Sequence, residues 1–197
     1  AGIFILPFFL FSAVAGQMAD KFQKPVLIRR LKIMEIIFMI MAAIGFFWGN
    51  IYFLLGVLFL MGTQSSFFGP LKYAILPDML KKEELIGANA LVEAATFIAI
   101  LLGTIMGAVF ILKDGGVSII AGFILAVAIM GWVASRTIPA SDIQNTAIKI
   151  NWNIFSASWD IIKIFYPQKG VFNAILGISW FWLVGFIFLA YLPVYGE

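Results

Sequence analysis

Several polar side chains lie inside or at the ends of long apolar segments, where a polar group needs a partner or a function. Glu93 stands out because it lies seven residues past Ile86 in an apolar run, hence about 10 Å along a helix axis. An ionised carboxylate at that depth is costly unless it is paired, protonated or facing water. Gln64, Lys72 and Asn89 lie near the ends of this apolar segment or the preceding one. These four residues are therefore candidates for contacting a polar group inside a membrane.

Three interpretations of Glu93 stay open. It pairs with a neighbouring helix or with Lys72, it contacts a substrate headgroup or a gate, or it takes part in proton coupling. Asn89 lies one helical turn before Glu93 on the same face, and Gly103 and Gly107 continue that stripe. We expect the two glycines to let another helix approach closely.

Two further polar sites favour structural roles. Glu35 lies near the start of an apolar segment, where Arg29 or Lys32 reaches it, so we expect an ion pair at the level of the membrane surface. Gln64 and the two serines after it precede an expected helix break at residues 69–70. We expect them either to line a cavity or to bridge two helices, and bridging is the more common role.

The last apolar segment contains Trp180 and Trp182 well inside its ends. Tryptophan usually gathers at the membrane interface. At this depth we expect the two rings either to pack between helices or to line an amphipathic cavity.

The composition is that of a membrane protein. The chain is 63% hydrophobic and 12% charged, whereas about a quarter of the residues of a soluble domain are charged. It has neither Cys nor His, which excludes disulfides and thiol chemistry and removes the commonest metal ligand. No nucleotide-binding, metal-binding or nucleophile motif is present in the sequence, so we expect no enzyme activity, cofactor, metal or nucleic-acid partner from this stretch.

Apolar runs of about 20 residues predict helices that span a bilayer. Six segments qualify or nearly qualify: 1–17, 28–49, 51–69, 86–112, 116–135 and 171–194. The predicted fold class is therefore an all-α membrane protein with six transmembrane helices.

The basic residues gather on one side of these segments. Lys113 lies alone in the loops on one side, and all other basic residues lie in or beside the loops on the other: Lys21, Lys24, Arg29, Arg30, Lys32, Lys72, Lys81, Lys82, Arg136, Lys149, Lys163 and Lys169. By the positive-inside rule the basic loops face the cytoplasm, which places Ala1 outside.

The short charged connection between the first two apolar segments carries a recognisable spacing. Gly16, Asp20, Lys21 and Lys24 match the loop signature of the major facilitator superfamily, with Gln23 where that family usually has glycine. The chain thus resembles this superfamily, in which the loop acts as a conformational latch. There its aspartate meets helix ends or basic groups of the opposite half, in keeping with the attraction between carboxylates and helix N-termini.

The resemblance implies a partial major facilitator fold. Because such transporters begin inside the cell, one helix is expected to be missing upstream, and the visible helices correspond to helices 2–7 of twelve. Residues 1–135 are then the N-terminal half without its first helix, 136–170 a cytoplasmic connection, and 171–197 the start of the C-terminal half. In the connection, polar residues share one arc of a helix and apolar residues the face beside it, which predicts a strap lying in the interface plane: Asn153, Ser156, Asp160 and Lys163, then Phe155, Trp159, Ile162 and Tyr166.

Three strings narrow the resemblance, at residues 62–73, 89–103 and 177–182. They are similar to the lysophospholipid transporters of the superfamily, including those fused to an acyltransferase. The resemblance implies inward flipping of lysophospholipids, notably lysophosphatidylethanolamine, across a bacterial inner membrane by alternating access. It also implies membrane lipids as surroundings and an acyltransferase as a possible partner or fused domain.

Three alternatives remain. The first is a facilitator-type exporter of drugs or small solutes, whose fifth helix often carries glycine followed by proline, whereas Ala108 follows Gly107 here. The second is an enzyme of which only the transporter portion is visible. The third is a membrane scaffold that transports nothing.

Overall fold

A computed structural model describes residues 2–140, 147–148 and 150–191 of the chain. Its described elements are all helices, in the order α1 (Gly2–Lys21), α2 (Lys24–Trp48), α3 (Ile51–Ala74), α4 (Leu76–Met79), a 3-10 turn (Lys82–Glu84), α5 (Leu85–Ile111), α6 (Gly116–Arg136), α7 (Ile154–Phe165) and α8 (Lys169–Tyr191). The chain forms two compact units, Ala1–Trp152 and Asn153–Glu197, and each is described by itself. The predicted all-α class is confirmed.

Five helical segments of the described residues are long and apolar enough to cross a membrane: Gly2–Lys21, Lys24–Trp48, Ile51–Met79, Lys82–Ile111 and Gly116–Arg136. They match the first five predicted spans. The sixth prediction, 171–194, coincides with α8, whose apolar part in the described residues, Lys169–Gly185, is shorter than these five. The end of that prediction, 192–194, lies outside the described residues.

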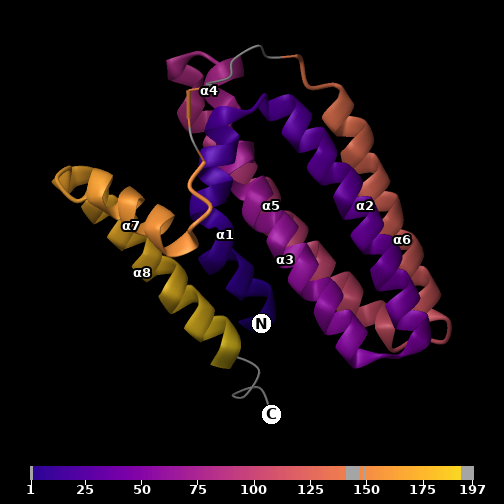
Figure 1. Cartoon of the computed structure of the whole chain (residues 1–197). Coiled ribbons are helices and arrows are strands. Elements are labelled where there is room, and N and C mark those ends of the chain that lie inside the picture. Colours follow the sequence, from indigo (N-terminus) through magenta and orange to yellow (C-terminus); the bar gives the residue numbers. More distant parts are fainter. Residues whose placement is uncertain (1, 141–146, 149, 192–197) are drawn as a thin grey trace. The chain divides into compact units, whose positions relative to one another are not determined.

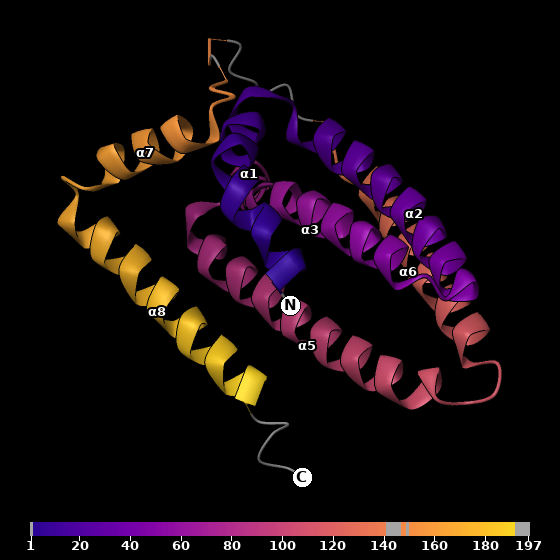
Figure 2. The same cartoon turned by 60° about the horizontal axis from the view of Figure 1, so that its bottom comes forward.

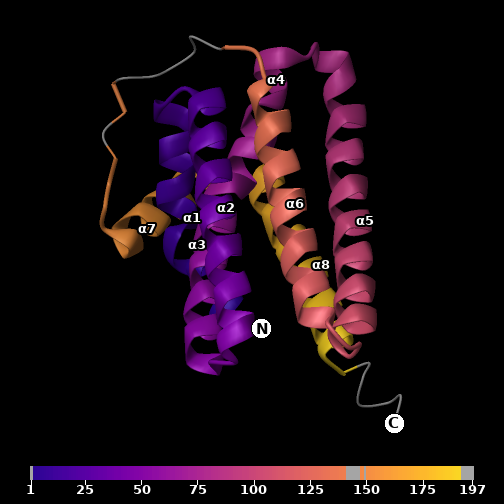
Figure 3. The same cartoon turned by 90° about the vertical axis from the view of Figure 1, so that its right-hand side faces the viewer.

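In the first unit, α1 packs against α3, α2 packs against both α3 and α6, and α5 runs beside α6 (Figures 1 and 3). The α1–α2 connection and α4 lie at one end of this bundle, whereas the α2–α3 and α5–α6 turns lie at the other. Successive long helices therefore run antiparallel. The end with α4 carries the basic loops, and we call it the basic end.

Helices α1 and α3 approach each other closely at a glycine, Gly62, that sequence reasoning missed. A Cβ added at Gly62 would lie 2.4 Å from the backbone oxygen of Phe4 and 3.2 Å from Pro7, which is fully buried. Farther along α1, the small residues Ala13 and Ala15 are also buried. Small side chains let two helix backbones approach closely. Close approach increases the dispersion contacts that drive helix association in lipid.

Two predicted boundaries are wrong, both because a helix continues past its apolar part. The signature expected as a turn is mostly helical: α1 ends at Lys21 and α2 begins at Lys24, where Pro25 fits the first turn because its missing N–H is not needed there. The helix break expected at Gly69 and Pro70 does not occur, since α3 continues through both to Ala74. Helices near a membrane surface tolerate proline where water or neighbouring groups satisfy the freed carbonyl.

The second unit consists of α7 and α8, which meet at a short connection (Figure 2). The Asn153 side chain caps α7 by accepting a hydrogen bond from the N–H of Ser156 at 3.1 Å. At the connection the rings of Tyr166 and Phe172 pack edge to face, with centroids 5.5 Å apart.

Candidate functional site

Two clusters of polar side chains connect α3 to neighbouring helices, one to α2 and one to α5. The cavity cluster consists of Lys32, Glu35, Gln64 and Ser65, and the end cluster consists of Lys72, Tyr73, Glu93 and Thr96. Gln64 and Lys72 are eight residues apart on α3, hence roughly 12 Å along its axis and on one face.

The cavity cluster joins α2 to α3 through a carboxylate. Lys32 Nζ lies 2.7 Å from Glu35 Oε2, and Gln64 Nε2 donates to the same oxygen at 3.3 Å and to the Leu31 carbonyl at 3.5 Å. Ser65 Oγ lies 3.4 Å from Gln64 Oε1. Gln64 is only 6% exposed, so its amide is held in one orientation by these bonds.

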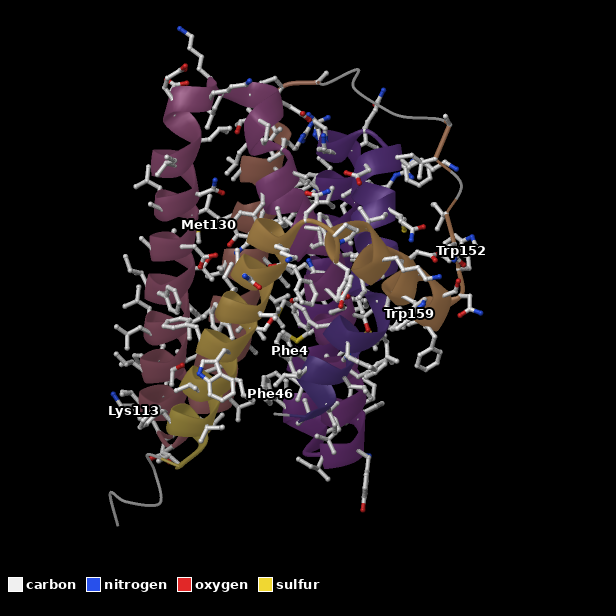
Figure 4. The ribbon with its side chains drawn as sticks, turned by 90° about the vertical axis from the view of Figure 1, so that its left-hand side faces the viewer. Phe4, Phe46, Lys113, Met130, Trp152 and Trp159 are labelled. Atoms are coloured by element: carbon white, nitrogen blue, oxygen red, sulfur yellow. The ribbon has the colours of Figure 1, made fainter. Side chains whose placement is uncertain are left out.

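These polar groups line a cavity of about 260 Å³. Its other walls are apolar and come from α1, α2 and α3: Phe4, Phe38, Met39, Met61 and Phe68. Phe4 is labelled in Figure 4, where it lies on the α1 ribbon. Lys32 Nζ lies 4.7 Å from the centroid of the Phe68 ring, a cation–π contact.

The end cluster joins α3 to α5. The Tyr73 hydroxyl donates to Glu93 Oε1, while Lys72 Nζ donates to Thr96 Oγ1 at 3.2 Å. Thr96 Oγ1 in turn donates to the Val92 carbonyl at 2.7 Å. Glu93 therefore does make an interhelical hydrogen bond, but its partner is Tyr73 and not Lys72.

The expected ion pair of Glu35 is confirmed, with Lys32 as its partner. The membrane-surface level expected for this pair stays a prediction, and the structure adds that the pair lines the cavity and that Glu35 bonds to Gln64. Arg29 instead donates to the carbonyls of Ser135 at 3.4 Å and Ile138 at 2.8 Å, at the end of α6. The spacing Lys32-x-x-Glu35 signalled the pair, but the cavity depends on how α1 and α3 cross α2.

The other candidate residues form no hydrogen bond with either cluster in the described structure. Asn89 is exposed and donates to the Leu85 carbonyl of its own helix at 2.8 Å. Gly103 and Gly107 border a small apolar pocket between α5 and α6, and a Cβ added at either meets no atom within 4 Å. Their role in close helix packing stays a prediction.

In the second unit, Trp180 and Trp182 are 68% and 50% exposed. The ring of Trp182 packs edge-on against Phe181, with centroids 6.2 Å apart. Their place in a substrate path stays a prediction.

The latch residues lie at the basic end. Asp20 is exposed in the last turn of α1, and Gly16 lies one turn earlier. Lys24 Nζ lies 2.6 Å from Asp78 Oδ2, so the start of α2 is tied to α4. Within the described part of the chain, neither Asp20 nor Lys21 takes part in an ion pair.

A family model described as Major Facilitator Superfamily matches residues 1–197. The curated relatives that the chain is similar to carry the name lysophospholipid transporter LplT. Those of Photorhabdus laumondii and Escherichia fergusonii are each 28% identical over 98% of this chain and 48% of the relative. The one from Serratia proteamaculans is 26% identical over 97% of this chain and 47% of the relative. The chain thus spans about half the length of these relatives, and no solved structure matches it.

Proposed function

The chain belongs to the major facilitator superfamily and is a multi-pass membrane protein, and from this premise we propose that it is part of a secondary lysophospholipid transporter. The proposed transport is inward across a bacterial inner membrane by alternating access, with lysophosphatidylethanolamine as cargo. The observation that carries the proposal is similarity over nearly the whole chain to bacterial relatives named for this function.

The polar groups along α3 suit such a cargo. A lysolipid has one acyl chain and a polar head, so its path must offer an apolar wall beside a polar track. Gln64, Phe68 and Lys72 follow one another at four-residue intervals and therefore lie on one face of α3. Lys72 can attract the phosphate of the head, and Glu93 its ammonium group. Asn89 extends this track one turn toward the start of α5.

The rest of the path is proposed from the second unit and from apolar surfaces. Trp180 and Trp182 are exposed aromatic rings on α8, which suits them to contact an acyl chain. Gly103 and Gly107 leave space on α5 for another helix or for a chain. Transported lysolipid would then be reacylated, by a separate acyltransferase or by one fused to this transporter.

Asp20 is proposed as the acidic part of a conformational latch, with Gly16, Lys21 and Lys24 as its companions. A carboxylate in the last turn of a helix faces the negative end of the helix dipole, so Asp20 does not stabilise α1. Its exposure makes it accessible to a basic group or helix N-terminus of the opposite half.

Helix α7 is proposed as a strap in the cytoplasmic interface. Its aromatic face is exposed, with Phe155 at 74% and Trp159 at 57%. Only Tyr166–Gln168 separates α7 from the apolar α8, which keeps it close to the membrane surface. Exposed aromatic rings on such a helix partition into the headgroup region.

The test is uptake of labelled lysophosphatidylethanolamine by proteoliposomes that contain the complete protein. Glu93→Gln should lower uptake about tenfold, because the amide keeps a hydrogen bond to Tyr73 but cannot attract an ammonium group. The thermal unfolding midpoint should stay close to that of the wild type, because the hydrogen bond to Tyr73 is kept.

Glu83→Gln is the matched control, since it removes the same charge at an exposed position of the 3-10 turn. It should leave uptake unchanged. Wild-type protein that imports no lysolipid would reject the proposed function, and export of unrelated small solutes would favour the drug exporter. Normal uptake by Glu93→Gln would remove only Glu93 from the path.

A further inference from the structure

The stretch of chain that joins the two compact units is bonded to the first unit at two separate places. It begins at Thr137, directly after α6, and it reaches the boundary between the units after Trp152. We call residues 137–152 the tether. The described residues at its two ends are 137–140 and 150–152, and both ends contact helices of the first unit.

The contact at the start of the tether is made by Arg29 of α2. Its Nη2 donates to the Ile138 carbonyl at 2.8 Å, and its Nε donates to the Ser135 carbonyl at 3.4 Å. The last carbonyls of a helix have no partner within that helix, and the helix dipole also favours a cation beside them. Hydrogen bonds from a charged donor are stronger than those from a neutral one. Arg29 therefore holds both the end of α6 and the first residues of the tether.

The side chain of Ile138 adds to this contact. It packs against an apolar cluster at the basic end, whose members come from α1, α2, α3 and the residue after α3: Ala19, Ile28, Leu31, Leu71 and Ile75. All five of these residues are buried. The first unit thus holds Ile138 by its main chain and by its side chain, and we call these contacts the first anchor.

The contact at the other end of the tether is made by Gln17 of α1. The backbone N–H of Asn151 donates to Oε1 of Gln17 at 2.7 Å. Gln17 is half-buried and lies about one helical turn before the end of α1, at the basic end. We call this hydrogen bond the second anchor.

Two anchors shorten the part of the chain that is free to bend. If the chain were held only by α6, the whole tether could swing as the units moved. With both anchors in place, bending is confined to the chain between Asn151 and α7, and Asn153 already caps that helix. The boundary between the two compact units lies at the same point, between Trp152 and Asn153. A short free segment limits how far the second unit can move from the first.

We propose that the tether moves as part of the first unit, and that the joint between the two units is the Trp152–Asn153 peptide. Arg29 and Ile138 hold one end of the tether, and Gln17 holds the other. This gives Gln17 and Arg29 a role in positioning the joint, which is separate from the proposed cargo path and holds for any cargo.

The experiment measures distances between pairs of spin labels in the complete protein, reconstituted in lipid nanodiscs, by electron paramagnetic resonance. This chain contains no cysteine, so within it the labels attach only to introduced ones. One label is placed by Tyr52→Cys, at an exposed residue in the first turn of α3, far from the basic end. The partner label is placed at the exposed Ala140, Trp152 or Lys163 in three separate proteins.

The three pairs distinguish the possible positions of the joint. The Tyr52–Ala140 and Tyr52–Trp152 pairs lie within the first unit, so each should give a single narrow distance distribution. The Tyr52–Lys163 pair spans the proposed joint, so its distribution should be broad or have two peaks. A broad distribution for Trp152 would place the joint within the tether, and a narrow one for Lys163 would mean that the units do not move about Trp152–Asn153. Either result would overturn the proposal.

The second anchor is tested by Gln17→Ala. This variant should broaden the Tyr52–Trp152 distribution and speed hydrogen exchange of the Asn151 amide roughly fivefold, as expected for the loss of one hydrogen bond. Gln23→Ala is the matched control, because the Gln23 side chain makes no capping bond at the start of α2. It should change neither measurement. A Gln17→Ala protein that behaves like this control would show that Gln17 does not hold the tether, which contradicts the proposal.

The first anchor is tested by Arg29→Gln, which should broaden the Tyr52–Ala140 distribution. Arg30→Gln makes the same change at the exposed neighbouring residue and should leave this distribution narrow. Ile138→Ala covers the case in which Arg29→Gln does not fold, because it keeps the guanidinium and removes only the apolar contact. It should broaden the same distribution, and a narrow one would rule out the first anchor. No lysolipid is transported in these measurements, so failure of the proposed function would leave their results unchanged.

Discussion

Glu35 and Glu93 are two carboxylates inside apolar helices, and both bond to α3, but they are held in different ways. Glu35 has a cation three residues earlier in its own helix and an amide from α3. Glu93 bonds to the hydroxyl of Tyr73, and among the described residues it has no ion pair. One carboxylate is compensated by charge and the other only by a neutral donor.

The surroundings of Glu35 are also more buried than those of Glu93. Gln64, which holds Glu35, is buried, and α3 beside it packs tightly on α1 through Gly62. No residue of α5, which carries Glu93, is buried in the described structure. The cavity cluster thus lies beside closely packed helices, whereas Glu93 lies on a helix that the described residues leave exposed.

The largest effect on stability is expected from Gly62→Leu, because it would displace α3 from both Glu35 and Glu93. The new side chain would meet the backbone of Phe4, which cannot rotate away. Overpacking of this kind costs about 1–3 kcal/mol. Thermal unfolding in detergent should show a midpoint several degrees lower.

Gly56→Leu is the control on the same helix, because a Cβ there meets no atom within 4 Å. Its unfolding midpoint should match the wild type. Equal midpoints for the two variants would mean that α1 and α3 are not closely packed at Gly62.

The next effect tests charge compensation at Glu35. Lys32→Gln leaves this carboxylate with Gln64 as its donor and no cation. Breaking one side of a buried ion pair costs about 3–5 kcal/mol, and the side chains of this pair are 18% and 20% exposed, so we expect about 2 kcal/mol. Denaturant or thermal unfolding measures it. If Lys32→Gln lowered the free energy of unfolding less than Tyr73→Phe does, Glu93 and not Glu35 would be the more strongly held carboxylate.

Tyr73→Phe should cost less, about 1 kcal/mol, because it removes only one neutral hydrogen-bond donor to Glu93. The helix that carries Glu93, α5, has no buried residue among those described. Solvent or a neighbouring polar group can replace that donor. Unfolding of Tyr73→Phe beside Tyr52→Phe, an exposed tyrosine, isolates the effect of the Glu93 contact. A cost equal to that of Lys32→Gln would show that α5 is held as rigidly as α2.

The helices themselves could be predicted from sequence, since lipid leaves a spanning segment few alternatives to an α-helix. Their ends could not, because charged turns such as the one ending at Lys21 stay helical after the apolar run has ended. At Pro70 the packed bundle likewise overrides a residue that usually ends a helix.

The contacts between helices depend on how each helix is rotated about its axis and where it crosses its neighbours. The periodicity of a single sequence does not give these two quantities. Gly103 and Gly107 have the spacing of a packing motif, yet a Cβ there meets no atom within 4 Å, whereas one at Gly62 would meet the backbone of α1. Glu93 was recognisable from its depth, but its partner Tyr73 depends on how α3 meets α5. Glu35 was recognisable as half of an ion pair, whereas its cavity needs three helices.

The smallest effect is expected at a second ion pair of the described residues, Lys24–Asp78, which tests whether the geometry of a pair or its surroundings sets its strength. Its 2.6 Å distance and side-chain exposures of 11% and 12% would suggest a stronger pair than Lys32–Glu35. It lies at the basic end, however, where water and salt screen charges over about 10 Å at 0.1 M ionic strength. We therefore expect a double-mutant cycle with Lys24→Gln and Asp78→Asn to give a coupling of about 0.5 kcal/mol that falls with added salt. The corresponding cycle for Lys32 and Glu35 should give a larger coupling that salt changes little, because the membrane replaces water around α2. The opposite order would mean that exposure within the protein, and not depth in the bilayer, sets the strength of these pairs.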